Sequence, residues 1–203
     1  MKAKINNKTH IEGYLYQHTL EMKESGPNSK NPGTVFISGN VDMDVYGNGV
    51  AVKAEGSSVT IAKGGQITVP KGTNYGYYAL AAYNGTINMN MGEDGADDVV
   101  LNGDLFALKD GAINVKLVTA NSKLNGIVDS DGETSIYLQK GATWNNVQNN
   151  RRYVLDDEDT GSGSFVDGKY VGASHVTNFY GGDSLDNAGI IKRIPMHEMT
   201  AAQ

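Results

Sequence analysis

The acidic segment 92–98, GEDGADD, holds the residues whose types and spacing come closest to the acid and base groups of an enzyme. Asp97 and Asp98, with Glu93 and Asp94 nearby, could exchange protons with a sugar or supply oxygen ligands to calcium. The same composition is typical of a solvated turn, and adjacent residues of a strand point to opposite faces. We favour the turn, and a catalytic carboxylate pair stays open as the alternative.

Two further acidic segments are candidates for calcium binding. Segment 95–104, GADDVVLNGD, is similar to one unit of a calcium-binding nonapeptide roll, but such rolls need tandem copies and the unit occurs once. Asp156, Asp157 and Asp159 belong to an acidic run that is typical of an exposed, self-repelling loop. We therefore expect no metal site and no cofactor.

Other familiar catalytic arrangements are missing from the sequence. The chain has 0 Cys, which excludes a thiolate nucleophile, a zinc–thiolate site and disulfides. His10, His18, His175 and His197 lack metal-ligand spacing, and neither a Gly-x-Ser-x-Gly elbow nor a phosphate-binding loop occurs. The formal net charge of -6 argues against nucleic-acid binding. We predict a protein that is not an enzyme and has no nucleic-acid partner.

Tyrosines offer a different chemistry, because exposed tyrosines supply contact area to proteins and glycans at low entropic cost. Several cluster in segment 74–83, NYGYYALAAY, and others lie in or beside a long loop. Packing in the core or stacking between coils is the alternative for these rings. The candidate partner-binding residues are Tyr75, Tyr77, Tyr78, Asp156, Asp157, Asp159, Tyr170 and Tyr180.

The elements that must position these residues are short strands. Apolar and polar residues alternate in segments 34–45, 57–69, 85–91, 111–118 and 134–139, and glycines, 26 in the whole chain, separate such segments. Alternation of this length, bounded by Gly, Asn and Asp, indicates β-strands. The sequence thus predicts an all-β protein.

The strands also repeat. Gly-Thr-Ile-Asn-Met begins at Gly85 and Gly-Ala-Ile-Asn-Val begins at Gly111, 26 positions later. Such intervals are typical of a solenoid, in which each strand pairs with its equivalent about 4.8 Å away in the next coil. The predicted vertical neighbours are Ile87 and Ile113, Met89 and Val115, and Asn88 and Asn114, the last forming a possible amide ladder. A sandwich of antiparallel hairpins is the alternative fold.

We divide the chain into an N-terminal cap or first coil (1–32), the main coils (33–150), a protruding loop (151–173) and a last coil, cut short (174–203). This length allows about six or seven coils. We expect Trp144, the sole tryptophan, to close a corner of a coil.

Segments 101–117, 124–147 and 175–183, followed by 189–191, resemble the coils of a known family. They are similar to the passenger domain of a Gram-negative autotransporter, of the pertactin-like adhesin type. This resemblance implies a right-handed parallel β-helix at the bacterial cell surface or released from it, joined to an outer-membrane barrel beyond residue 203. It also implies a role in adhesion to host cells, matrix or neighbouring bacteria, and so in biofilm and virulence.

The expected partner is a host or bacterial surface protein or glycan, with possible self-association through exposed ends of the β-helix and no direct membrane insertion of this segment. Two alternatives remain: a carbohydrate-active β-helix enzyme (a polysaccharide lyase or glycoside hydrolase) and a trimeric phage tail-spike. An inverting hydrolase would need two carboxyl groups ~6.5–9.5 Å apart. The distinguishing question is whether Asp97, Asp98, Asp129 and Asp131 share one groove.

Overall fold

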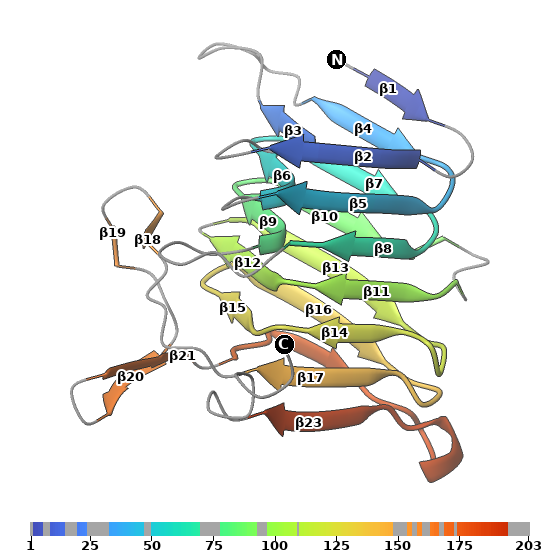
Figure 1. Cartoon of the computed structure of the whole chain (residues 1–203), viewed down its shortest axis with the longest axis vertical. Coiled ribbons are helices and arrows are strands. Elements are labelled where there is room, and N and C mark those ends of the chain that lie inside the picture. The colour runs from blue at the N-terminus through green and yellow to red at the C-terminus, as the bar shows by residue number, and fades with distance from the viewer. Residues whose placement is uncertain are drawn as a thin grey trace.

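A computed structural model shows a stack of short strands wound into coils (Figure 1). It describes residues 2–5, 9–14, 20–23, 33–46, 50–69, 78–92, 97–108, 110–147, 154–155, 158–159, 163–166, 169–172 and 174–194. The only helical element among these residues is a single 3-10 turn, η1 (Leu185–Asn187). In this part of the chain, no helix is long and apolar enough to span a membrane.

Three parallel sheets run along the stack, and each coil contributes one strand to each sheet in turn. Sheet A contains β1 (Lys2–Ile5), β4 (Thr34–Ile37), β7 (Ser58–Ile61), β10 (Thr86–Met89), β13 (Ala112–Leu117), β16 (Glu133–Leu138) and β22 (Asn178–Tyr180). Sheet B contains β2 (Thr9–Tyr14), β5 (Val41–Tyr46), β8 (Gly65–Thr68), β11 (Val99–Asn102), β14 (Lys123–Asn125), β17 (Thr143–Val147) and β23 (Ile190–Ile194). Sheet C contains β3 (Leu20–Lys23), β6 (Val50–Glu55), β9 (Tyr78–Tyr83), β12 (Asp104–Leu108) and β15 (Val128–Ser130).

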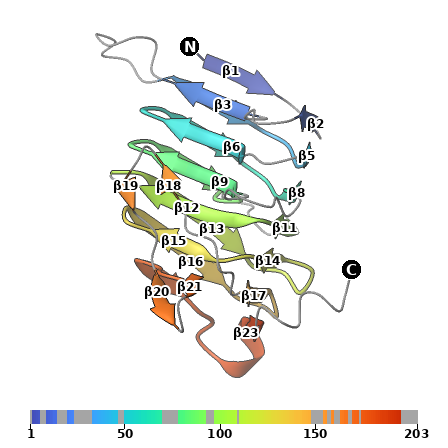
Figure 2. The same cartoon turned by 60° about the vertical axis from the view of Figure 1, so that its left-hand side comes forward.

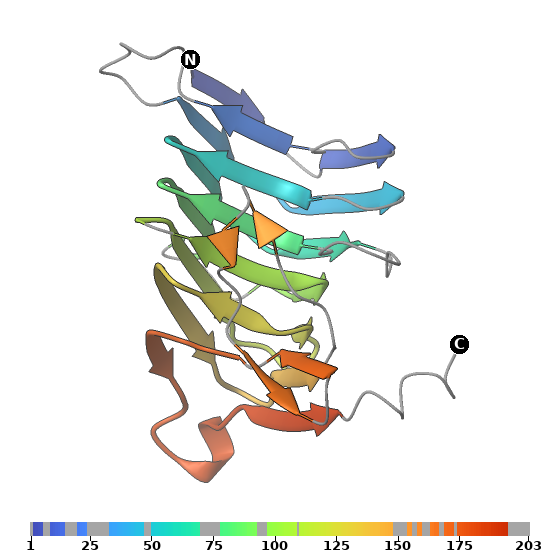
Figure 3. The same ribbon diagram turned by 90° about the vertical axis from the view of Figure 1, so that its left-hand side faces the viewer.

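The coils wind in a right-handed sense. In Figure 1 the strands of sheet B cross the front from right to left, and those of sheet A cross behind from left to right as the chain descends. Figure 3 shows sheet C connecting the front of the stack to its back. The predicted parallel β-helix is therefore confirmed, and the antiparallel sandwich is not the fold of this chain. Where the sequence predicted six or seven coils, the sheets contain seven, seven and five strands.

The core is a set of apolar ladders inside the coils. Strand β13 alternates between half-buried and buried residues along its whole length, as its sequence pattern predicted. Ile87 pairs with Ile113 and Met89 with Val115, so the predicted register is confirmed. All four side chains are fully buried. A single coil could not bury these residues, so each coil depends on its neighbours for stability.

Trp144 lies within β17, where it pairs with Leu124 and belongs to the core. It is 4% exposed, and its Nε1 donates a hydrogen bond of 2.9 Å to the carbonyl oxygen of Gly126. The prediction that Trp144 closes a corner was wrong. The alternation of β17 places its ring inward, and the carbonyl group of the coil above satisfies the indole N–H.

One close approach of the backbone explains the glycine at the start of strand β8. Gly65 has a φ of 123°, and a Cβ atom there would overlap the carbonyl oxygen of Val41 in the coil above. Only glycine combines that φ with the absence of a side chain. This position therefore fixes how closely two successive coils can stack.

Four further strands interrupt the stack after β17. β18 (Val154–Leu155) pairs with β19 (Glu158–Asp159), and β20 (Gly163–Val166) pairs with β21 (Lys169–Gly172), both in antiparallel fashion. Figures 1, 2 and 3 place these strands outside the coils, beside sheet C.

The chain then rejoins the stack below β15. The backbone N–H of His175 donates to the carbonyl oxygen of Val128 at 2.7 Å, and the backbone N–H of Val128 donates to Ser174 Oγ at 3.1 Å. Residues 174 and 175 thus bond to the last strand of sheet C where a sixth strand would otherwise lie.

Candidate functional site

The outer face of sheet B carries a hydrogen-bonded ladder of polar side chains, formed by Thr68, Asn102, Asn125 and Asn145 in four successive coils. Asn102 Nδ2 donates to Thr68 Oγ1 at 3.1 Å, and Asn125 Nδ2 donates to Asn102 Oδ1 at 2.6 Å. Asn145 Nδ2 donates in turn to Asn125 Oδ1 at 2.5 Å. The alternation of each strand turns these residues away from the core, and the parallel register aligns them.

This ladder leaves hydrogen-bonding capacity for a partner. A side-chain amide has two N–H donors and an oxygen with two lone pairs. Within the ladder Asn102 and Asn125 each donate one hydrogen bond and accept one. Each amide therefore keeps a second donor and a second lone pair, repeated about every 4.8 Å. The sequence prediction missed this ladder, although the repeated Leu-Asn-Gly at 101–103 and 124–126 could have revealed it.

The same outer face is charged toward both ends of the stack. Asp42 and Asp44 lie on β5, near the N-terminal end, and alternate with buried neighbours, so both point outward. Lys123 is exposed on β14, in the middle part of the face, and Lys192 is exposed on β23, at its C-terminal end. The N-terminal part of the face is therefore acidic, and its last strand carries a lysine.

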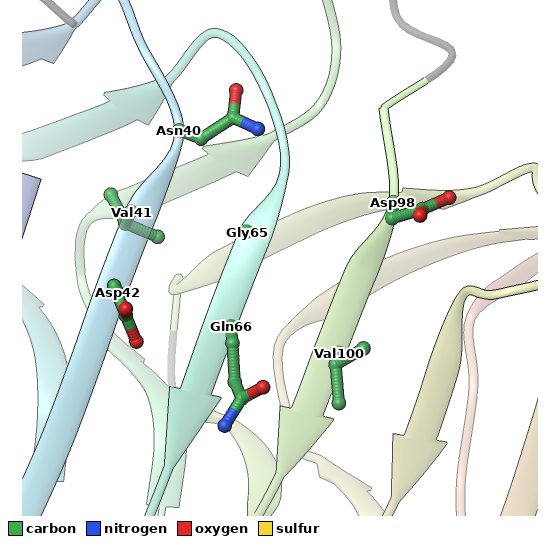
Figure 4. Close-up of a pocket in the computed structure, with 7 residues that line it drawn as sticks. All are labelled: Asn40, Val41, Asp42, Gly65, Gln66, Asp98 and Val100. Carbon is green, nitrogen blue, oxygen red and sulfur yellow. The ribbon is translucent and has the colours of Figure 1, made fainter. Parts of the chain in front are cut away.

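A depression lies on this face where Gly65 has no side chain (Figure 4). It is lined by Asn40, Val41, Asp42, Gly65, Gln66, Asp98 and Val100. The Asp98 carboxylate accepts hydrogen bonds from Thr119 Oγ1 at 2.6 Å and from Asn121 Nδ2 at 3.0 Å. Both of its oxygens are thus engaged with the next coil, and Asp98 holds a corner of the stack together.

The four carboxylates that would mark an enzyme do not gather in one groove. Asp97 and Asp98 immediately precede β11 of sheet B. Asp129 lies in β15 of sheet C and is 1% exposed, and Asp131 follows it in an exposed turn. Asp97 and Asp98 thus lie at a turn from sheet A to sheet B, whereas Asp131 lies at a turn from sheet C to sheet A. Among the described residues, no three His, Asp or Glu side chains are grouped so that they could hold a metal ion.

Sheet A carries the amide pair that the sequence predicted. Asn88 pairs with Asn114, and Asn114 Nδ2 donates to Asn88 Oδ1 at 2.9 Å. Beside it Tyr137 and Tyr180 stack with ring centroids 4.3 Å apart and planes 13° apart, and Lys116 Nζ lies 5.8 Å from the centroid of Tyr137. Tyr180, a predicted contact residue, is 42% exposed. It is the accessible end of a stack of aromatic and cationic groups.

Tyr78, a candidate partner-binding residue, is buried in the structure. It is 5% exposed, and its ring centroid lies 5.1 Å from that of Phe106. Both belong to a second apolar cluster on the outer face of sheet C, the face beside β18–β21. Burial there removes Tyr78 from the surface that a partner could reach.

Tyr75, Tyr77, Asp156 and Asp157 lie outside the described residues. Asp159 lies in β19 and Tyr170 in β21, on the antiparallel strands that leave the stack.

Comparison of the chain with protein families, curated proteins and solved structures found no match.

Proposed function

We propose that this chain is a surface-displayed, extracellular β-helical passenger segment of an autotransporter and acts in adhesion. The observation that carries the proposal is that the outer faces present ordered amide groups, whereas the candidate catalytic carboxylates are not available for chemistry. A hydrogen-bonded ladder runs unbroken over four coils of sheet B and an amide pair joins two coils of sheet A, whereas Asp98 is engaged in structural bonds and Asp129 is buried. A rigid array of this kind suits recognition of a surface better than proton transfer at one point.

Further support comes from the fold and from the resemblance of its coils to the passenger family. Parallel coils form an elongated stack that holds its side chains at fixed spacing. Tyr180 and its stacked neighbour Tyr137 add an exposed aromatic edge to the amide pair of sheet A. Aromatic and amide groups together are suited to contact with proteins or glycans.

The test is a binding array of host matrix proteins, bacterial surface glycans and host glycans, with analysis of any glycan product. We expect binding without cleavage. Tyr180→Ala, or replacement of residues 156–173 by a short Gly-Ser linker, should weaken it. Leu185→Ala is the matched control, because Leu185 is 96% exposed in η1 and lies outside both ladders.

Two results would overturn the proposal. One is cleavage of a glycan that disappears in Asp97→Asn or Asp98→Asn, since this would make the chain a carbohydrate-active enzyme. The other is the absence of binding to every array component, combined with no gain in adhesion when the chain is displayed on a cell surface.

A further inference from the structure

Asparagine followed by glycine occurs three times in the part of the chain that the structure describes, at Asn84–Gly85, Asn102–Gly103 and Asn125–Gly126. Such a pair is reactive, because the backbone nitrogen of the glycine can attack the side-chain carbonyl carbon of the asparagine. Glycine has no side chain to hinder this approach. A further pair, Asn48–Gly49, lies outside the described residues. The three described pairs therefore place one reactive dipeptide in different surroundings.

The two pairs on sheet B are held on both sides of the bond that would have to form. Asn102 and Asn125 each donate and accept a side-chain hydrogen bond within the ladder. The backbone N–H of Gly103 donates to the carbonyl oxygen of Asn125 at 3.1 Å. The N–H of Gly126 donates in the same way to Asn145 at 3.1 Å, and both glycines are buried. Ring closure at either pair would require these hydrogen bonds to break first.

Asn84 and Gly85 form the turn from β9 to β10, which joins sheet C to sheet A. The Asn84 side chain is exposed and makes no hydrogen bond with any described residue. Its backbone has a φ of 48°, in the left-handed region that asparagine adopts more readily than most residues. The N–H of Gly85 also donates to none of the residues that the structure describes. No described hydrogen bond therefore has to break before this nitrogen and this amide meet.

We propose that Asn84 is a site of spontaneous deamidation, and that the ladder of sheet B protects Asn102 and Asn125 from the same reaction. The Gly85 nitrogen loses its proton to solvent hydroxide and bonds to Cγ of Asn84. The side-chain nitrogen of Asn84 takes a proton from water and leaves as ammonia, so that a succinimide ring remains. The reaction needs no oxidant, reductant or enzyme.

Water then opens the succinimide in one of two ways. Breaking the bond from the Gly85 nitrogen to Cγ yields aspartate. Breaking the bond from this nitrogen to the α-carbonyl carbon yields isoaspartate, in which the main chain runs through the former side chain. Either product carries one new carboxylate, so the formal net charge of -6 becomes more negative by one unit.

The packing of Gly85 decides what each product does to the stack. A Cβ atom on Gly85 would lie 2.7 Å from the carbonyl oxygen of Ser57 in the previous coil, so the backbone is closely packed at this turn. Aspartate keeps the length of the main chain and, like asparagine, tolerates the left-handed conformation. Isoaspartate lengthens the main chain by one carbon atom. We therefore expect isoaspartate to loosen the stack between β9 and β10, and aspartate to leave it intact.

Peptide mapping by mass spectrometry tests the proposal on the purified full chain, aged in warm, mildly alkaline buffer. In the folded chain, Asn84 should convert at least about tenfold faster than Asn102 or Asn125, because the ladder pairs must first break several hydrogen bonds. In concentrated urea, where the fold is absent, the three pairs should convert at similar rates. Fragmentation by electron transfer distinguishes isoaspartate from aspartate at position 84.

A ladder variant tests whether the hydrogen bonds protect. Asn125→Ala removes the amide that donates to Asn102 Oδ1, so Asn102 should convert faster than in the unmodified chain. Asn88→Ala removes one member of the amide pair on sheet A and is the matched control, which should leave the conversion of Asn102 unchanged. Circular dichroism confirms that both variants are folded during the incubation. Conversion of Asn102 at the same rate in both variants would show that the ladder does not protect it.

The two products are compared by urea denaturation. Asn84→Asp reproduces the aspartate product and should unfold at about the same urea concentration as the unmodified chain. The isoaspartate form, separated from the aged chain by ion exchange, should unfold at a lower urea concentration. An isoaspartate form as stable as Asn84→Asp would contradict the close packing of this turn.

Two results would overturn the proposed site. One is conversion of Asn102 or Asn125 in the folded chain as fast as that of Asn84. The other is an unconverted Asn84 in the folded chain after an incubation in which all three pairs convert in urea. Neither result bears on adhesion, because binding to the array is measured with freshly purified chain, and the deamidation does not depend on the proposed function.

Discussion

Asn114 donates a side-chain hydrogen bond of 2.9 Å to Asn88, its equivalent one coil earlier, 26 residues away along the chain. Because the strands pair in parallel and in register, one residue type repeated at one position becomes a continuous line of bonded groups. The same relation joins Asn102, Asn125 and Asn145 on sheet B. The outer faces therefore stabilise the stack and present an ordered surface at the same time.

Asn125→Ala should reduce the free energy of unfolding by about 1–2 kcal/mol, because it removes two side-chain hydrogen bonds from a half-buried ladder. Urea denaturation followed by circular dichroism measures this loss. Lys123→Ala, on the same strand but exposed, is the control and should change stability by less than about 0.5 kcal/mol. Equal effects of the two substitutions would mean that the ladder does not stabilise the stack.

Gly65→Ala should destabilise the protein by more than about 4 kcal/mol or prevent its folding, since the added Cβ overlaps the backbone of the coil above. Gly141→Ala tests the backbone conformation alone. Its φ is 78°, but the nearest atom to an added Cβ is 3.6 Å away, so a loss of about 1–2 kcal/mol is expected. A Gly65→Ala variant as stable as Gly141→Ala would contradict the close stacking of β5 and β8.

Trp144 reports on the core through its fluorescence. With 4% of its surface exposed and its Nε1 bonded to a carbonyl oxygen, it should emit at short wavelength and resist quenching by iodide. Trp144→Phe should cost about 2–4 kcal/mol, because it leaves a cavity and an unpaired carbonyl group. Ready quenching in the folded protein would show that β17 does not face inward.

Tyr137 and Tyr180 should stabilise each other by about 0.5–1.5 kcal/mol through ring stacking. A double-mutant cycle with Tyr137→Ala and Tyr180→Ala isolates this coupling from the separate effect of each substitution. The pair also tests whether β22 rejoins the stack beside β16, as the register places it. Strict additivity of the two losses would argue against that placement.

The repeated Gly-x-Ile-Asn pattern was enough to predict the parallel register of β10 and β13, because the fold places equivalent residues directly above one another. The ladder of Asn102, Asn125 and Asn145 follows the same rule but was missed. Its strands are short, and the third member lacks the Leu-Asn-Gly signature of the other two.

Tyr78 shows what the sequence could not reveal. It belongs to the apolar cluster on the outer face of sheet C, a face that would be exposed in an isolated coil stack. On sheet C that face is buried, and the antiparallel strands that leave the stack after β17 lie beside it. No local pattern in the sequence distinguishes a buried outer face from an exposed one, so the burial of Tyr78 and that of Asp129 came from the structure.

The in-register stacking of outward side chains underlies the proposed binding surface, and disulfide cross-linking tests this stacking most directly. The chain has 0 Cys, so a pair can be introduced without interference. Thr60 and Asn88 are paired residues on β7 and β10, and their Cα atoms lie about 4.8 Å apart, within the range that a disulfide spans.

Mild oxidation of the variant Thr60→Cys with Asn88→Cys should therefore form an intramolecular disulfide in the native state. Thr60→Cys with Asn114→Cys, two coils apart, should remain reduced, because about 9.6 Å exceeds that range. Rapid cross-linking of the first pair alone is the result that the parallel stack predicts. Cross-linking of the second pair, or of neither pair, would contradict it.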